Sequence, residues 1–94
     1  MANDVKVLKL ITGEEVIARV TEEKNNLITL EKPMILQMLA PDRTTGQIPF
    51  ALLPWMKAAK NEKVTISTEH IIAEDEASEQ TEKNYLQLVT GLSL

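Results

Sequence analysis

Two short polar stretches carry the residue types best suited to contact a nucleic acid. The first is Lys24-Asn25-Asn26, and the second is a segment that contains Lys57, Lys60 and Lys63. Lysine ammonium groups meet phosphates, and asparagine amides can hydrogen-bond the edges of bases. Both stretches interrupt runs of apolar residues, so we expect both in loops or turns of a sheet. Solvated turns without a ligand have the same composition, and that alternative stays open.

The sequence shows no catalytic signature. No stretch matches a phosphate-binding loop, a dinucleotide-binding glycine pattern or a nucleophile elbow. His70 is the only histidine and directly follows a predicted strand, which favours a surface or locally hydrogen-bonded role. The carboxylates of Glu14-Glu15 and of Glu22-Glu23 should point to opposite faces of a strand, which argues against acid–base pairs. We therefore expect no catalytic residues and a protein that is not an enzyme.

We also expect neither a metal site nor a cofactor. The chain has no cysteine, which excludes disulfides and thiolate zinc sites. The acidic run Glu74-Asp75-Glu76 lacks the alternating oxygens and central glycine of a calcium loop. Its charge is better explained by the favourable field at a helix N-terminus. Trp55 and Met56 could offer a stacking surface to a base, but packing within the protein or between copies is the favoured interpretation.

Length and charge narrow the class of protein further. A chain of 94 residues suits a single domain, residues 1–94, and a net charge of −4 argues against indiscriminate coating of DNA. Six of the acidic residues lie from Glu69 onward, where Lys83 is the only lysine, so a local basic patch is feasible earlier in the chain. The start of the chain lacks the features of a signal peptide, and no apolar run approaches the roughly 20 residues that cross a bilayer. These observations predict a soluble, cytoplasmic protein without membrane contact.

The apolar pattern predicts strands through residues 5–71 and a helix after them. Runs typical of strands cover about residues 5–11, 15–23, 27–39, 48–56 and 64–71. Gly13 suits the first turn, and two asparagines suit the second, because these residues accept a positive φ. Pro33 interrupts the third strand, so we expect a bend or bulge there. Apolar residues then recur at helical spacing, which predicts a C-terminal α-helix over about residues 76–90.

The two predicted hairpins resemble the opening motif of the Sm-like (LSm) proteins. Gly13 takes the place of the motif's turn glycine, and Asn26-Leu27-Ile28-Thr29-Leu30 matches its Asn-Leu-apolar-polar-Leu run. The strand Val64-Thr65-Ile66-Ser67 looks like the family's last strand, and the whole chain looks like a phage-encoded marine member. Several features differ from the family pattern, and two of them concern the helix and the last loop. The helix lies at the end of the chain, and Asn61-Glu62-Lys63 stands where the family has Arg-Gly or Lys-Gly.

The resemblance implies an all-β fold, namely a strongly bent, five-stranded antiparallel open barrel followed by the C-terminal α-helix. It implies a homo-oligomeric ring, pentamer to heptamer, that binds single-stranded RNA or DNA through pore-facing loops and acts in RNA or DNA processing. The fourth strand, around residues 50–56, would pair with the last strand of the next copy. A phage-encoded member would act in the cytoplasm of the host cell. Carried over residue by residue, the nucleic-acid-binding residues are Lys24, Asn25, Asn26, Lys60 and Lys63.

A structural or assembly protein is the second interpretation of the same sequence. Its acidic C-terminal helix would dock on a protein partner, and no nucleic acid would be involved. The net charge of −4 favours this interpretation. So does the scarcity of aromatic side chains for base stacking, since Phe50, Trp55 and Tyr85 are the only ones.

Overall fold

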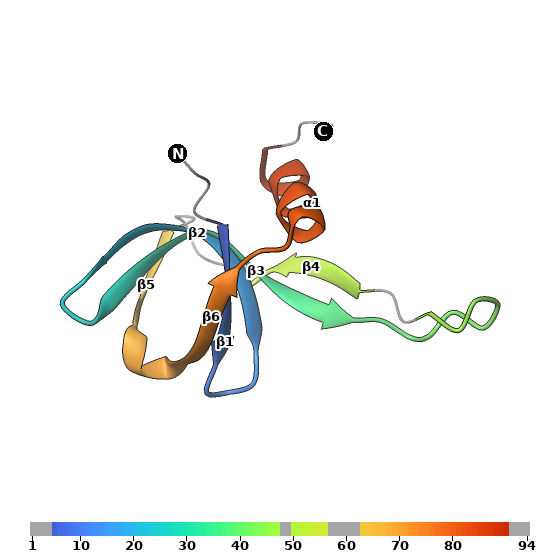
Figure 1. Cartoon of the computed structure of the whole chain (residues 1–94), viewed down its shortest axis with the longest axis horizontal. Coiled ribbons are helices and arrows are strands. Elements are labelled where there is room, and N and C mark those ends of the chain that lie inside the picture. Colours follow the sequence, from blue (N-terminus) through green and yellow to red (C-terminus); the bar gives the residue numbers. More distant parts are fainter. Residues whose placement is uncertain (1–4, 48–49, 57–62, 91–94) are drawn as a thin grey trace.

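A computed structural model describes residues 5–47, 50–56 and 63–90 of the chain, which form a curved antiparallel sheet and one α-helix (Figure 1). The expected fold class, all-β with a C-terminal helix, is confirmed, but the described part has six strands instead of five. In chain order the elements are β1 (Val5–Leu10), β2 (Glu15–Lys24), β3 (Leu27–Met38), β4 (Phe50–Pro54), β5 (Lys63–Ser67), the 3-10 turn η1 (Thr68–His70), β6 (Ile71–Glu76) and α1 (Glu79–Thr90).

The long strand β3 organises the sheet. One edge of β3 pairs with β2. The other edge has two partners, because residues 27–31 pair with β5 and residues 34–38 pair with β4. From β2 the sheet continues to β1 and then to β6, all antiparallel. The two partners of β3 therefore extend the same edge in succession, on either side of a bend.

The bend in β3 lies at Lys32 and Pro33, which confirms the bend predicted at the proline. Lys32 has a φ of 52°, in the left-handed region that residues other than glycine rarely adopt. Pro33 has no amide hydrogen to donate to a ladder. The ladder between β2 and β3 changes register between Ile17 and Arg19, opposite this bend. An irregularity of this kind increases the local twist and lets the sheet curl into an open barrel.

The end of the sheet differs from the prediction. The strand expected over residues 64–71 stops at Ser67, whose hydroxyl accepts the N–H of Glu69 at 3.3 Å and caps η1. A further strand, β6, then pairs with β1. The acidic run from Glu74 to Glu76 belongs to β6, so its assignment to the helix N-terminus is wrong. The helix begins later, at Glu79, and Ser78 caps it by accepting the N–H of Thr81 at 3.2 Å.

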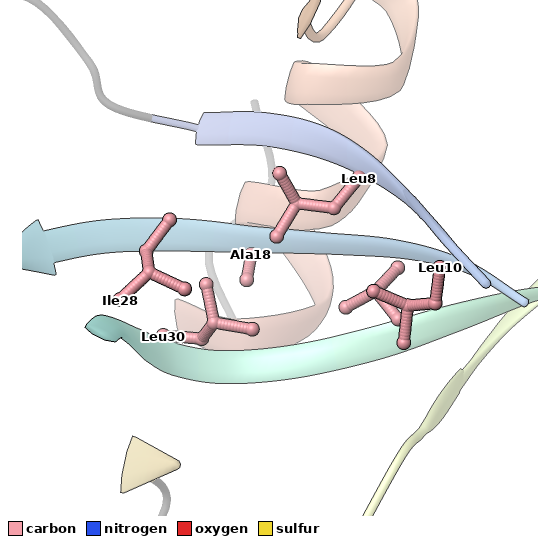
Figure 2. Close-up of a cluster of buried hydrophobic side chains, with 6 residues drawn as sticks. Leu8, Leu10, Ala18, Ile28 and Leu30 are labelled. Carbon is pink, nitrogen blue, oxygen red and sulfur yellow. The ribbon is translucent and has the colours of Figure 1, made fainter. Parts of the chain in front are cut away.

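Buried apolar side chains cover both faces of the central strands. One cluster lies together among β1, β2 and β3 (Figure 2) and packs against partly buried side chains that include Trp55, Ile66 and Ile71. Neighbouring residues of a strand point to opposite faces, so Ile17 belongs to a second cluster with Val5 and Tyr85, under α1. The members of the first cluster are Leu8, Leu10, Val16, Ala18, Ile28 and Leu30.

Tyr85 docks α1 on the bend of β3. Its side chain is 1% exposed, and its hydroxyl contacts the carbonyl oxygens of Glu31 at 2.8 Å and Lys32 at 2.9 Å. The ammonium group of Lys32 in turn donates to the carbonyl oxygen of Val89 at 3.1 Å. The helix and the bend therefore hold each other in place through contacts more than 50 residues apart in the sequence.

Candidate nucleic-acid interface

The turn between β2 and β3 carries three of the five predicted binding residues. Asn25 and Asn26 have φ values of 55° and 62°. Two consecutive residues with positive φ are what a type I′ turn requires, and its twist matches that of the strands it joins. The ladder reaches the turn, since Lys24 pairs with Leu27. The asparagine turn predicted from the sequence is confirmed, and it forms the tip of a hairpin that projects from the sheet (Figure 1).

The turn η1 supports this tip, a contact that the sequence did not predict. The backbone N–H of Thr68 donates to the carbonyl oxygen of Asn26 at 3.0 Å, and the Thr68 hydroxyl contacts the same oxygen at 3.3 Å. The backbone of the hairpin tip is thus fixed from the side by Thr68. The available signal was the pair Ser67-Thr68, because both side chains favour caps and turns over the middle of a strand.

Polar groups surround the tip and leave Lys24 accessible. The Lys24 ammonium lies 3.7 Å from the Glu22 carboxylate, and the two side chains are 71% and 59% exposed. An ion pair this exposed contributes little, so the lysine can exchange its carboxylate for a phosphate. Beside it lies an open cavity of about 230 Å³ whose lining includes Lys24, Asn25 and the hydroxyl-bearing pair Thr29 and Thr65. The tip therefore offers an ammonium group, amides and hydroxyl groups within one small region.

Lys63 lies apart from this tip. It pairs with Glu31, whereas Ser67, at the other end of β5, pairs with Leu27 beside the asparagine turn. The two ends of β5 are four residues apart, which in an extended strand is a distance of roughly 13 Å. The structure thus brings Lys24, Asn25 and Asn26 together and places Lys63 at the far end of the same ladder. Lys60 lies outside the described residues.

A second cavity opens at the turn between β1 and β2. The Glu14 carboxylate accepts two hydrogen bonds there, from the Thr12 hydroxyl at 2.8 Å and from the indole N–H of Trp55 at 3.2 Å. Trp55 also packs against the first buried cluster, in agreement with the packing role favoured from the sequence. The cavity has a volume of about 230 Å³ and is lined by Leu10, Ile11, Thr12, Glu14, Trp55, Ile66 and His70.

Metal sites and membrane-spanning helices are both missing from the described ranges 5–47, 50–56 and 63–90. No group of three or more histidine, aspartate and glutamate side chains in these ranges could hold a metal ion. Within the same ranges, no helix has both the length and the apolar character needed to cross a bilayer.

Comparison with known proteins identifies the family. The model of the Sm-like domain matches residues 7–86, which run from β1 into α1 and include the asparagine turn. Curated proteins give no match to the chain. The matched range extends well beyond the hairpins that carry the resemblance in the sequence, whereas a phage origin stays a prediction. The chain belongs to the Sm-like family.

Proposed function

We propose that this protein is a non-enzymatic, homo-oligomeric ring that binds single-stranded RNA or DNA and acts in its processing, in the cytoplasm. The observation that carries the proposal is the asparagine turn, where Lys24, Asn25 and Asn26 sit at the exposed tip of a hairpin. Membership of the Sm-like family supports it, because members commonly form rings that bind RNA. Each copy would supply one weak contact, and the ring would repeat that contact along the strand.

Open strand edges support assembly of the ring. The strands β4 and β6 are the two ends of the sheet order, and in the described part of the chain each pairs along one edge alone. Unpaired backbone N–H and C=O groups invite pairing with another chain. Pairing of β4 with β6 of the next copy is a head-to-tail contact, which closes into a ring if the rotation per copy permits. The last strand was expected over residues 64–71, but it is β6. We therefore propose β6 as the strand that pairs with β4 of the next copy.

Sedimentation velocity tests the ring directly. At micromolar concentration we expect one species with a mass between that of a pentamer and that of a heptamer of the 10.5 kDa chain. The physical reason is that a closed ring leaves no edge of β4 or β6 unpaired, whereas a shorter assembly does. A clean monomer over this concentration range would contradict the proposal.

Substitution of the asparagine turn tests the nucleic-acid contact. We expect the triple variant Lys24→Gln, Asn25→Gly, Asn26→Gly, here called the turn variant, to bind a labelled oligo-uridine about tenfold or more weakly. Glycine accepts the positive φ of both turn positions, so the hairpin keeps its shape while the amides and the ammonium group are lost. Fluorescence anisotropy measures the binding, and sedimentation confirms that the ring persists.

Arg43→Gln is the matched control for charge. Arg43 is exposed in the connection between β3 and β4, so this variant removes one positive charge away from the tip. Its binding should stay near that of the unmodified protein. Affinity of the unmodified protein should also fall as salt rises, because phosphate contacts release counterions. Unchanged binding by the turn variant would contradict the assignment of Lys24, Asn25 and Asn26.

Lys60 and Lys63 remain part of the proposal as a second, separate contact with the strand. Lys63 lies at the opposite end of β5 from the asparagine turn. We therefore expect its contribution to the binding free energy to add to that of the turn. A Lys60→Gln, Lys63→Gln variant combined with the turn variant should then show the sum of the two losses in binding free energy.

An assembly protein that docks α1 on a protein partner is the second candidate function. A cavity of about 410 Å³ lies between α1 and the β3–β4 pair, with Leu36, Leu52 and Leu88 among its lining residues. Leu88 is 55% exposed on a helix whose first turn carries Glu79 and Glu82. A pull-down from lysate before and after nuclease treatment separates the two candidates, since a protein partner survives the nuclease and a partner bridged by nucleic acid does not.

A further inference from the structure

We propose that the cavity at the β1–β2 turn is a second ligand site, which takes a single nucleobase and prefers guanine. This goes beyond the function proposed above, in which the strand meets the asparagine turn. The side chains that build the cavity come from β1, the β1–β2 turn, β5, η1 and the residue after β4, and none of them belongs to Lys24, Asn25 or Asn26.

The size and walls of the cavity fit one flat ring system. Its volume of about 230 Å³ lies below the roughly 300–1,000 Å³ of sites that hold drug-sized ligands, so it suits one base, with the attached sugar lying outside the open cavity. Leu10, Ile66 and the indole of Trp55 supply apolar walls. Aromatic side chains beside apolar ones are the usual surface on which unpaired bases stack.

The Glu14 carboxylate supplies the polar recognition. A carboxylate has about four acceptor sites on its two oxygens. Thr12 occupies one site on Oε1, and the Trp55 indole N–H occupies one on Oε2. Each oxygen therefore keeps one acceptor site, and the two existing hydrogen bonds hold the carboxylate in a fixed orientation. Two neighbouring acceptors are matched best by two parallel N–H donors, as in a carboxylate–guanidinium pair.

Guanine is the base that presents this pair of donors. Its ring N1–H and its exocyclic amino group lie side by side on the Watson–Crick edge. Adenine and cytosine present one amino donor beside a ring-nitrogen acceptor, so they can satisfy one oxygen of Glu14. Uracil flanks its single N–H with two carbonyl oxygens, which the carboxylate repels. The expected order of affinity is therefore guanine, then adenine and cytosine, then uracil.

The chain contains its own reporter for this site. Trp55 is the only tryptophan, so all indole emission comes from a residue that lines the cavity. We expect guanosine to quench Trp55 emission in a saturable titration, with an affinity about tenfold or more above that of uridine. Neutral nucleosides are the appropriate probes, because they lack the phosphate that the asparagine turn is proposed to contact. N-acetyltryptophanamide corrects for light absorbed by the nucleoside.

Two variants locate the recognition at Glu14. Glu14→Gln keeps the shape of the side chain but replaces one acceptor oxygen with an N–H donor, so guanosine affinity should fall about tenfold or more, toward that of uridine. Glu15→Gln is the matched control, because Glu15 is the next residue and does not line the cavity. Its titration should match that of the unmodified protein. Both variants should keep the unmodified circular dichroism spectrum.

The proposal is overturned if neither guanosine nor a uridine hexamer that carries one guanosine quenches Trp55, if the guanine-containing probe and its uridine counterpart quench equally, or if Glu14→Gln leaves the titration unchanged. Two further titrations distinguish a free nucleoside from a base within a strand as the ligand. Quenching by guanosine alone shows that a free nucleoside suffices. Quenching only by a uridine hexamer that carries one guanosine, and not by the all-uridine hexamer, assigns the site to a base within a strand. The turn variant should still respond to guanosine, so failure of one site is distinguished from failure of the other.

Discussion

Replacing Leu8 with alanine is expected to lower the free energy of unfolding by about 3–5 kcal/mol. Leu8 is fully buried at the middle of β1, within the first cluster (Figure 2). The strands β2 and β6 pair with β1 on both sides of this position, so the backbone cannot move in to fill the space left by the lost atoms. A domain of this length has a total stability of roughly 5–14 kcal/mol, so the loss would be a large fraction of it.

Urea unfolding followed by circular dichroism measures this loss. The comparison is made at a fixed protein concentration, because assembly would stabilise the folded state by mass action. Met38→Ala is the control, since Met38 lies at the end of β3 and is 68% exposed, and its change should stay within about 0.5 kcal/mol. An equal effect of the two substitutions would mean that Leu8 is not part of the core.

Replacing Tyr85 with alanine is expected to cost about 3–5 kcal/mol and to release α1 from the sheet. Tyr85 is the largest fully buried side chain of the described residues and the centre of the second cluster. The substitution removes its ring from between the helix and the sheet. It also removes the hydroxyl that contacts the carbonyl oxygens of Glu31 and Lys32. Guanidinium unfolding measures the free energy, and the ellipticity at the helix band before unfolding reports whether α1 persists.

Tyr85→Phe separates the contribution of the ring to stability from that of the hydroxyl. Phenylalanine keeps the ring but leaves two partly buried carbonyl oxygens without the hydroxyl, which should cost about 1–2 kcal/mol. Leu88→Ala, on the exposed side of the same helix, should have almost no effect. If Tyr85→Ala behaved like Leu88→Ala, then α1 would not depend on this contact for its position.

The sequence predicts the first half of the fold well because its signals are local. Gly13, with a φ of 98°, and the asparagine pair each occupy turns that need positive φ, and turns of this kind set the register of the strands beside them. The bend at Pro33 follows from the lost amide hydrogen of that residue. The turn that brings Lys24, Asn25 and Asn26 together is therefore predicted by local sequence, whereas their binding of nucleic acid stays a prediction.

The sequence does not predict β6, because that strand is defined by its partner. Five of its six residues are exposed, so it lacks the apolar alternation of a half-buried strand, and its acidic residues are typical of a helix N-terminus. Pairing with β1 decides its conformation, as tertiary context often does for strands. The contacts that build the two candidate sites could not be predicted for a similar reason. The contacts of Asn26 with Thr68 and of Glu14 with Trp55 join residues about 40 positions apart, which no local pattern can show.

The left-handed residue at the bend of β3, Lys32, bears on the number of subunits in the proposed ring. The strand β3 carries β4 beyond the bend, while β6 belongs to the part of the sheet reached through β2 and β1. In the proposed ring, the angle at Lys32 would therefore set how β4 of one copy is inclined to β6 of the next. In the proposed ring that inclination is repeated once per copy, and rings of five, six and seven copies differ by roughly 10° in the rotation per copy. A change of that size in the backbone at Lys32 would therefore add or remove a subunit.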